Sequence, residues 1–147
     1  MKKIIILVVV LSTLTMIVVS TIYYIYINNL AVSNNTKKQN EKFEYYYKKE
    51  IMGTELITVF NKATQSNEDN VVEKDKNGKY IDNSTNSINI DIKFIDEDVT
   101  YNFKTIINNG TEQFISYYRE IIFKCTEISY HEQTKNVKYM LFEQITE

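Results

Sequence analysis

The sequence predicts an α+β protein, in which an N-terminal transmembrane helix is followed by a small domain with helices packed on an antiparallel sheet. Residues Ile4–Ile27 form an uncharged apolar run long enough to cross a bilayer. The rest of the chain mixes segments of helical periodicity with segments in which apolar and polar residues alternate. Because the connections between these segments are short, we expect antiparallel strand pairs rather than parallel crossovers.

Charge separates the two parts of the 147-residue chain. The formal net charge is −2, and Lys2 and Lys3 are the only charged side chains before Lys37, so residues 1–36 carry +2 and the remainder carries −4. This small, dispersed acidic excess argues against nucleic acid as a partner, since nucleic-acid binding needs a basic face. Frequent Ile, Asn, Lys and Tyr, without Pro or Trp, indicate an AT-rich bacterial genome.

The apolar run has the length and the ends of a membrane span. Its 24 residues extend about 36 Å as a helix, enough to cross a hydrocarbon core of roughly 30 Å. Hydroxyl side chains in the run can bond back to helix carbonyls, so lipid tolerates them. These are Ser12, Thr13, Thr15, Ser20 and Thr21. An interfacial belt of aromatic rings is expected at the far end, from Tyr23, Tyr24 and Tyr26.

The predicted topology is that of a single-pass protein of the cell membrane, with the lipid bilayer as its first partner. The basic pair Lys2-Lys3 marks its side of the span as cytoplasmic. We therefore expect a cytoplasmic N-terminus at 1–3, a transmembrane helix at 4–27, a polar linker at 28–36 and an extracytoplasmic α+β domain at 37–147.

A cleaved signal peptide is the alternative interpretation of the same run. Lys2-Lys3 would be its basic region, and Ala31-Val32-Ser33 offers small residues for cleavage. The run exceeds the usual 7–15 apolar residues and ends in tyrosines, which favours a retained anchor. Both interpretations place the following domain outside the cytoplasm.

Three helices are predicted in the domain. The first covers 37–51 with apolar residues Phe43, Tyr46, Tyr47 and Ile51 on one face. Gly53 interrupts it, and Thr54 can cap a second helix to about Thr64, which would bury Leu56, Val59, Phe60 and Ala63. A third runs from Thr111 to about Arg119 and would bury Phe114, Ile115 and Tyr118.

The predicted strands cover 71–74, 79–81, 88–94, 99–105, 121–130 and 137–145. Asn77-Gly78 is the strongest hairpin signal, and Asp96-Glu97-Asp98 should turn the chain before the fourth strand. The inward faces should supply the core with Ile88, Ile90, Ile92, Phe94, Phe103, Phe123 and Leu141.

The reactive residue types are few. Cys125 is the only cysteine and alternates with Phe123 on an apolar strand face, so we expect a buried thiol. His131 is the only histidine, and we expect it at the surface; a Cys125–His131 pair remains the less favoured alternative. No residue is predicted to be catalytic, to bind a cofactor or to ligate a metal.

Acidic and asparagine motifs have simpler interpretations than ion binding. Glu73, Asp75, Asn77 and Gly78 imitate a calcium loop, but its twelfth position is Ser84, so a hairpin turn is expected. The run 96–98 is interpreted as a solvated turn. Asn34, Asn83 and Asn109 begin glycosylation sequons that matter only in a eukaryotic host.

The tyrosine run Tyr45-Tyr46-Tyr47, with Phe43 and flanking lysines, could stack on a partner or lie on lipid headgroups. Packing of two of the three rings against the domain is the favoured interpretation.

One resemblance would cover nearly the whole chain, and a second, looser one concerns the order of its parts. The run Gly53–Thr58 with Asn61-Lys62-Ala63, and Phe123–Thr126 with Tyr130-His131, resembles small single-span membrane-anchored proteins of clostridia-type bacteria. That resemblance carries over no functional residue. The order of apolar helix and α+β head is also similar to type IV pilin-like proteins. Those have a Gly before the processing site and a Glu five residues into the mature helix, whereas no acidic residue precedes Glu41 here.

Three function classes follow from these observations. A membrane-tethered, non-catalytic interaction module of the bacterial cell envelope, with an envelope protein as partner, is favoured. A pilin-like or secretion-associated structural subunit is the alternative; a continuous helix from Ile4 through Ile51 would favour it, and a break at 28–36 would count against it. An enzyme is the third class, and the sequence offers it no nucleophile–base pair, phosphate loop or metal set.

Overall fold

The computed structural model describes residues 1–95, 97 and 99–145. The chain divides into two compact units, Met1–Asn35 (the N-terminal unit) and Thr36–Glu147 (the C-terminal unit). Two residues of the expected acidic turn, Asp96 and Asp98, lie outside the described residues.

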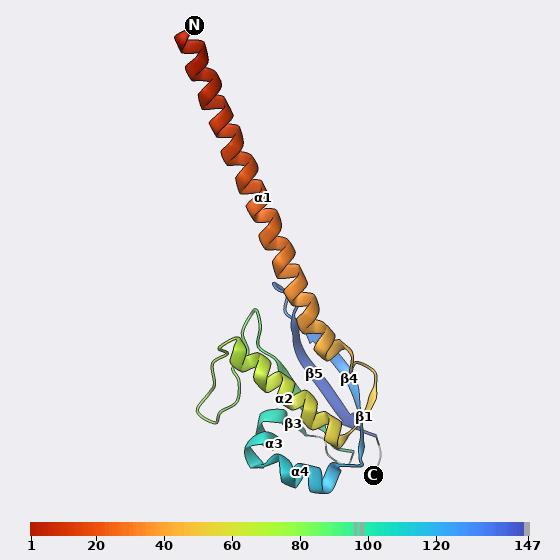
Figure 1. The fold of residues 1–147 in the computed structure, drawn as a ribbon. Coiled ribbons are helices and arrows are strands. Elements are labelled where there is room, and N and C mark those ends of the chain that lie inside the picture. The colour runs from red at the N-terminus through yellow and green to blue at the C-terminus, as the bar shows by residue number, and fades with distance from the viewer. Residues whose placement is uncertain (96, 98, 146–147) are drawn as a thin grey trace. The chain divides into compact units, whose positions relative to one another are not determined.

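The N-terminal unit is helical. Helix α1 spans Lys2–Glu44, of which Lys2–Asn35 belongs to this unit, and residues 28–36 are helical rather than an irregular linker (Figure 1). All five hydroxyl side chains of the apolar run bond back to carbonyls three or four residues earlier, as Ser12 Oγ does to Val9 O at 2.8 Å. The backbone and the hydroxyls of this segment therefore satisfy their hydrogen bonds within the helix.

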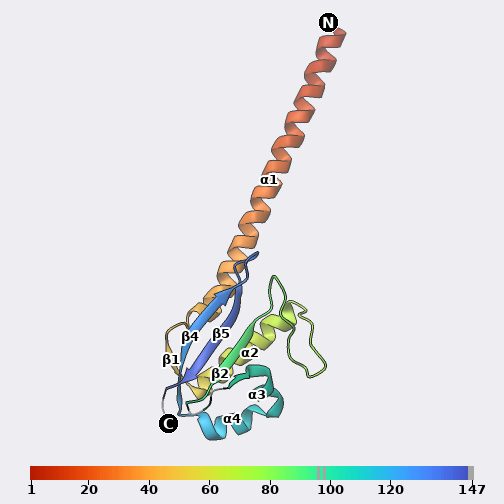
Figure 2. The ribbon, with the colours of Figure 1, turned by 180° about the vertical axis from the view of Figure 1, so that it is seen from behind.

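The C-terminal unit is an α+β domain, which confirms the predicted class. Its five strands lie in the order β1-β4-β5-β2-β3. They are β1 (Glu50–Met52), β2 (Asn89–Lys93), β3 (Thr100–Asn102), β4 (Ile122–Tyr130) and β5 (Val137–Gln144). Helix α2 (Gly53–Asp69) lies on one face of the sheet, and Figure 2 shows the opposite face. Two short helices, α3 (Phe103–Asn109) and α4 (Thr111–Tyr118), join β3 to β4.

The sheet is mostly antiparallel, as predicted, but one of its strand pairs is parallel. Strands β2 and β5 pair in parallel, with Ile90 opposite Met140 and Ile92 opposite Phe142, whereas the other three pairs are antiparallel. Parallel neighbours need a long connection. Here β3, α3, α4 and β4 together supply it, because β2 and β5 are not consecutive strands. The short connections between consecutive segments therefore did not reveal that β2 and β5, which are not consecutive, are neighbours in the sheet.

One face of the sheet and the facing side of α2 form the core. The four residues predicted to be buried on α2 are all fully buried, as are Ile88, Ile90, Ile92, Phe103 and Phe123. Leu141 was predicted wrongly: it is only partly buried, and β5 turns Met140 and Phe142 inward instead. The β4–β5 ladder has register irregularities between Cys125 and Glu127 and between Ser129 and Tyr130. Such irregularities shift the alternation by one position.

Two predicted elements end earlier than expected. The helix predicted for 37–51 stops at Glu44, and Ile51 reaches the core from strand β1 instead. The strand predicted for 99–105 stops at Asn102, whose side-chain oxygen accepts a hydrogen bond from Lys104 N at 3.1 Å and caps α3. Asparagine is a preferred N-cap because its side chain satisfies a free amide of the first turn.

Gly53 lies where α2 meets the connection between α4 and β4. Its amide donates to Ile121 O at 3.0 Å. A Cβ atom placed on Gly53 would lie 2.0 Å from the carbonyl oxygen of Tyr118, which belongs to the backbone and has no rotamer to change. Only glycine lets these two segments approach this closely.

We predict that Gly53→Ala destabilises the protein, because the added methyl group must push two backbone segments apart. The expected loss is about 1–3 kcal/mol or more, the range for overpacked sites. Urea unfolding followed by circular dichroism measures it. Thr54→Ala, at the next and exposed position of the same helix, is the control and should change the midpoint much less. Equal midpoints for Gly53→Ala and the unmodified protein would contradict the close contact.

Candidate functional site

The buried thiol was predicted correctly. Cys125 is fully buried on β4, and its Sγ donates to Glu127 O at 3.4 Å. Its backbone bonds to the segment before β1, since Lys48 N donates to Cys125 O and Cys125 N donates to Lys49 O. Burial raises the pKa of the thiol to about 12. At neutral pH the reactive thiolate is therefore a negligible fraction.

His131 was predicted at the surface, and this was wrong. The side chain is 2 % exposed, and its Nε2–H donates to the carbonyl oxygen of Ser87 at 2.8 Å. Its backbone closes the turn between β4 and β5, where His131 N donates to Asn136 O. Cys125 lies six residues earlier along β4, about 20 Å away at the rise of a strand. The two side chains are thus not brought together.

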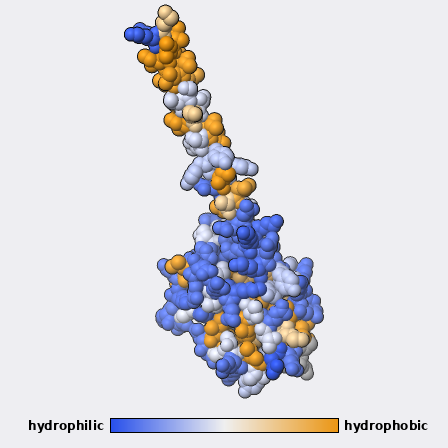
Figure 3. All heavy atoms as spheres, in the orientation of Figure 1, coloured by the Kyte–Doolittle hydropathy of each residue, from blue (hydrophilic) through white to orange (hydrophobic). Residues whose placement is uncertain are grey.

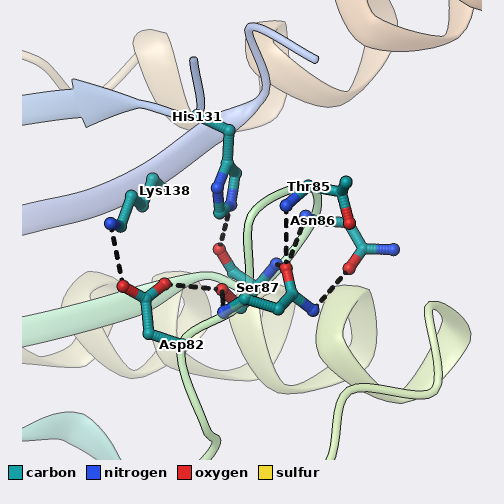
Figure 4. A network of polar contacts seen from close by, with 7 residues as sticks. Asp82, Thr85, Asn86, Ser87, His131 and Lys138 are labelled. Atoms are coloured by element: carbon teal, nitrogen blue, oxygen red, sulfur yellow. Dashed lines mark hydrogen bonds and ion pairs between the residues drawn. The ribbon is translucent and has the colours of Figure 1, made fainter. Parts of the chain in front are cut away.

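The same region gathers the residue types of a hydrolytic triad, Asp82, Ser87 and His131 (Figure 4). Their geometry lacks the hydrogen bond between the serine hydroxyl and the imidazole that a triad needs. Ser87 Oγ donates to Asp82 Oδ1 at 2.9 Å and accepts from Asn83 N at 2.9 Å, whereas His131 bonds the carbonyl of Ser87 and not its hydroxyl. Ser87 is also fully buried. A nucleophilic serine needs its hydroxyl on the base and open to substrate, so this group holds a loop in place.

Asparagine and threonine side chains complete this loop. Asn83 Oδ1 accepts the backbone amides of residues 85, 86 and 87, and its Nδ2 donates to Asn86 Oδ1 (Figure 4). Thr134 and Asn136, in the turn after β4, both donate to Thr85 O. Of the three sequon asparagines, Asn83 thus has its amide engaged within the protein, whereas Asn34 and Asn109 are exposed.

An ion pair closes the network at the sheet. Lys138 Nζ lies 2.8 Å from Asp82 Oδ2, and both side chains are partly exposed. Desolvation raises the pKa of Asp82, but the hydrogen bonds from Lys138 and Ser87 outweigh it, so the pKa lies below its usual value of 3.8. The carboxylate is therefore favoured in the folded protein.

Two further asparagines act as backbone anchors. Asn67 of α2 donates to Ile88 O and accepts from Ile88 N, each at 2.8 Å, and is fully buried. Asn40, in the last part of α1, donates to Lys135 O at 2.8 Å and accepts from Val137 N at 2.9 Å. An amide side chain carries both a donor and an acceptor, so it can replace a strand neighbour at the point where a strand begins.

The acidic segment at 73–78 forms the expected turn. Asp75 Oδ1 accepts the amides of Asn77 and Lys79, and Lys74 pairs with Tyr80 in an isolated antiparallel bridge. The Asp75 carboxylate is thus occupied by its own turn. Within residues 1–95, 97 and 99–145, no group of three or more His, Cys, Asp or Glu side chains could hold a metal ion.

The tyrosine run packs less than predicted. Tyr46 is buried, but Tyr45 is 58 % exposed and Tyr47 is 37 % exposed, so one ring rather than two belongs to the core. Lysines cover the exposed rings: Lys49 Nζ lies 3.2 Å from the ring centroid of Tyr45. Such cation–π contacts occur within the protein and need no partner.

A pocket of about 280 Å³ lies between α3 and α4. Its wall is aromatic, and the described residues that line it carry no charge. Rings come from Phe94, after β2, and from Phe114, Tyr117 and Tyr118 of α4, while Asn109 and Gln113 add side-chain amides. The sequence did not predict this pocket, because Phe94 fitted the alternation of a strand and Phe114 and Tyr118 fitted the spacing of a helix that packs on the core.

Comparison of the chain with protein-family models, curated proteins and solved structures finds no match. The functional interpretation therefore depends on the chain's own residues.

Cys125 gives a direct test of the buried face. Native protein should react slowly with iodoacetamide at neutral pH and rapidly in denaturant. The raised pKa of Cys125 keeps the thiolate fraction low, and burial keeps the reagent away from the sulfur. Cys125→Ser should lower the free energy of unfolding by about 1–3 kcal/mol, since it buries a more strongly polar group. Cys125→Ala should cost less. Rapid labelling of the folded protein would contradict the burial.

The Asp82–Lys138 pair predicts a pH dependence of stability. Because the pKa of Asp82 is lowered on folding, its contribution is complete above the usual value of 3.8 and disappears as the pH falls through the lower folded value. Asp82→Asn should therefore be less stable at neutral pH, by under about 1 kcal/mol for so exposed a pair. The difference should vanish in acid. Lys138→Met should show the same pH dependence: it should be less stable than the unmodified protein at neutral pH and equally stable in acid. Urea unfolding at several pH values measures both variants. A loss of stability that grows on acidification would contradict a stabilising Asp82–Lys138 pair.

Proposed function

We propose that this chain is a membrane-tethered, extracytoplasmic interaction module of the bacterial cell envelope, without catalytic activity. The supporting observation is the length and apolar composition of α1. This helix is long and apolar enough to cross a membrane, and apolar residues predominate in its N-terminal part (Figure 3). Its leucine, isoleucine and valine side chains need an apolar environment. A bilayer supplies one along the whole helix circumference.

The composition of the helix supports this proposal over one alternative. The core helix of a soluble protein also passes a test of length and hydropathy. The 24 uncharged residues of 4–27, with hydroxyls that bond back to helix carbonyls, favour a membrane span. A signal sequence passes the test as well, and it would deliver the domain to the same side of the membrane. Lys2 and Lys3 support a cytoplasmic N-terminus in either case.

The absence of catalysis is proposed from how the reactive groups are used. The thiol of Cys125 is desolvated, the imidazole of His131 holds a backbone carbonyl, and the hydroxyl of Ser87 is buried on a carboxylate. Each group stabilises the fold and is closed to a substrate. An interaction module needs a rigid surface rather than a reactive group. The hydrogen bonds of Ser87 and His131 hold the loop before β2 in place and so contribute to such rigidity.

A pilin-like or secretion-associated subunit is the second candidate. The observation that favours it is the absence of a break at 28–36, which lie within α1. The helix ends at Glu44, however, and does not extend to Ile51. Recovery of the protein in filaments sheared from the cell surface would favour this candidate over the tethered module.

We predict that the full-length protein stays in the membrane pellet after carbonate and high-salt washes. Replacing Leu14 and Val18 together by Arg should release it, because each charge at a span's centre costs about 2.5–3.5 kcal/mol. Leu30→Arg, beyond the span, is the matched control and should remain in the pellet. Full-length protein in the soluble fraction would contradict the anchor, and a new N-terminus at Asn34 in mass spectrometry would establish a cleaved signal peptide.

The same protein reports its orientation through cysteine labelling, since native Cys125 is buried. Gln133→Cys, exposed in the turn after β4, should react with a membrane-impermeant maleimide in intact cells. Lys3→Cys should react only after permeabilisation. The reverse pattern would place the domain in the cytoplasm.

A further inference from the structure

We propose that the pocket between α3 and α4 binds a pyranose ring of a neutral envelope glycan. The proposal rests on the proposed extracytoplasmic location for the source of its ligand, because the envelope is where such glycans are found. The fit itself rests on three properties of the described residues that line the pocket: their aromatic rings, their unpaired polar groups and their lack of charge.

The aromatic wall is braced by the core. The ring of Tyr118 lies 4.8 Å from that of Phe94 and 5.0 Å from that of Phe114, measured between centroids. Phe94 and Phe114 each also lie about 6 Å from the fully buried ring of Phe123. These contacts fix the rings before any ligand arrives, so little conformational entropy is lost on binding.

Tyr117 stands apart from this braced cluster. Its side chain is 72 % exposed although it lines the pocket, and its ring centroid lies 6.4 Å from that of Tyr118. An aromatic face is electron-rich, and the C–H groups on one face of a pyranose ring are weakly positive. A sugar ring can therefore pack on an exposed tyrosine while its hydroxyls point to the rim.

The rim offers neutral donors and acceptors. The amides of Asn109 and Gln113 and the hydroxyl of Tyr117 have no hydrogen-bond partner among residues 1–95, 97 and 99–145. An amide provides a donor and an acceptor together, which matches both a sugar hydroxyl and an acetamido group. Such unpaired groups around a hollow specify the orientation of a polar ligand.

The lining also narrows the class of ligand. Among the described residues that line the pocket there is no Lys, Arg, Asp or Glu, so these residues offer nothing to neutralise a phosphate, a carboxylate or an ammonium group. A purely apolar ligand would leave the two amides and the hydroxyl unpaired, at a cost in free energy. A volume of about 280 Å³ lies just below the usual range for drug-sized ligands, which suits a single ring of a longer polymer.

The test uses the full-length protein in a detergent without a sugar headgroup. A tetrasaccharide of β-1,4-linked N-acetylglucosamine and cellotetraose are the probes, followed by saturation-transfer NMR and calorimetry. Binding of either sugar supports the proposal. Tyr117→Ala should weaken it roughly tenfold, the scale of one aromatic contact. Tyr117→Phe should retain most of the binding, and Gln113→Ala should weaken it.

Tyr45→Ala is the matched control, because it removes another exposed tyrosine of the same unit outside the pocket. It should bind the sugar like the unmodified protein. Absence of binding to both sugars would overturn the proposal, as would binding that neither pocket variant changes. Equal binding of a linear alkyl alcohol would also overturn it by identifying a non-selective apolar hollow. None of these outcomes bears on membrane extraction, so failure of the glycan site and failure of the membrane tether remain distinguishable.

Discussion

Asn67 holds both ends of the long irregular segment that leads into the sheet. Its backbone carbonyl accepts from Val72 N at 2.9 Å, just after α2, while its side chain bonds the amide and the carbonyl of Ile88, just before β2. The register of β2 against β5 depends on where the chain arrives at Ile88. A slip of one residue would turn Ile88, Ile90 and Ile92 away from the core. The parallel pair at the centre of the sheet thus depends on one buried amide.

Local patterns predicted most of the elements, and contacts distant in sequence determined the rest. Alternation identified the strand at 88–94, and helical spacing identified the buried face of α2, because both signals lie within a single segment. The parallel partner of β2 could not be read from any segment. Leu141 was misplaced because irregularities in the β4–β5 ladder changed the alternation. The strand predicted for 99–105 was drawn too long because Tyr101 and Phe103 alternate as strand residues do, whereas the Asn102 cap ends the strand and starts α3.

The candidate sites also divide into those predicted from local sequence and those determined by contacts distant in sequence. The burial of Cys125 followed from its apolar strand neighbours, so the sequence predicted it. His131 was misjudged because its partner, the Ser87 carbonyl, lies 44 residues earlier, and a lone polar residue at a strand end ordinarily faces water. The pocket between α3 and α4 was not predicted from the sequence for a related reason. Its rings come from Phe94 and α4, which the alternation and spacing placed in the core, and only the packed structure leaves Tyr117 beside the open amides of Asn109 and Gln113.

The frequent asparagines compensate for a shortage of turn residues. The chain has three glycines and no proline, so few turns can use the backbone freedom of glycine or the fixed angle of proline. After α2, Val71 takes a left-handed φ of 53°, which is costly for a β-branched residue and usually falls to glycine. Val71 N bonds Glu68 O and lets the next residue, Val72, enter the core. Buried asparagines supply the hydrogen bonds that keep such strained connections folded, and this is why the polar network is structural.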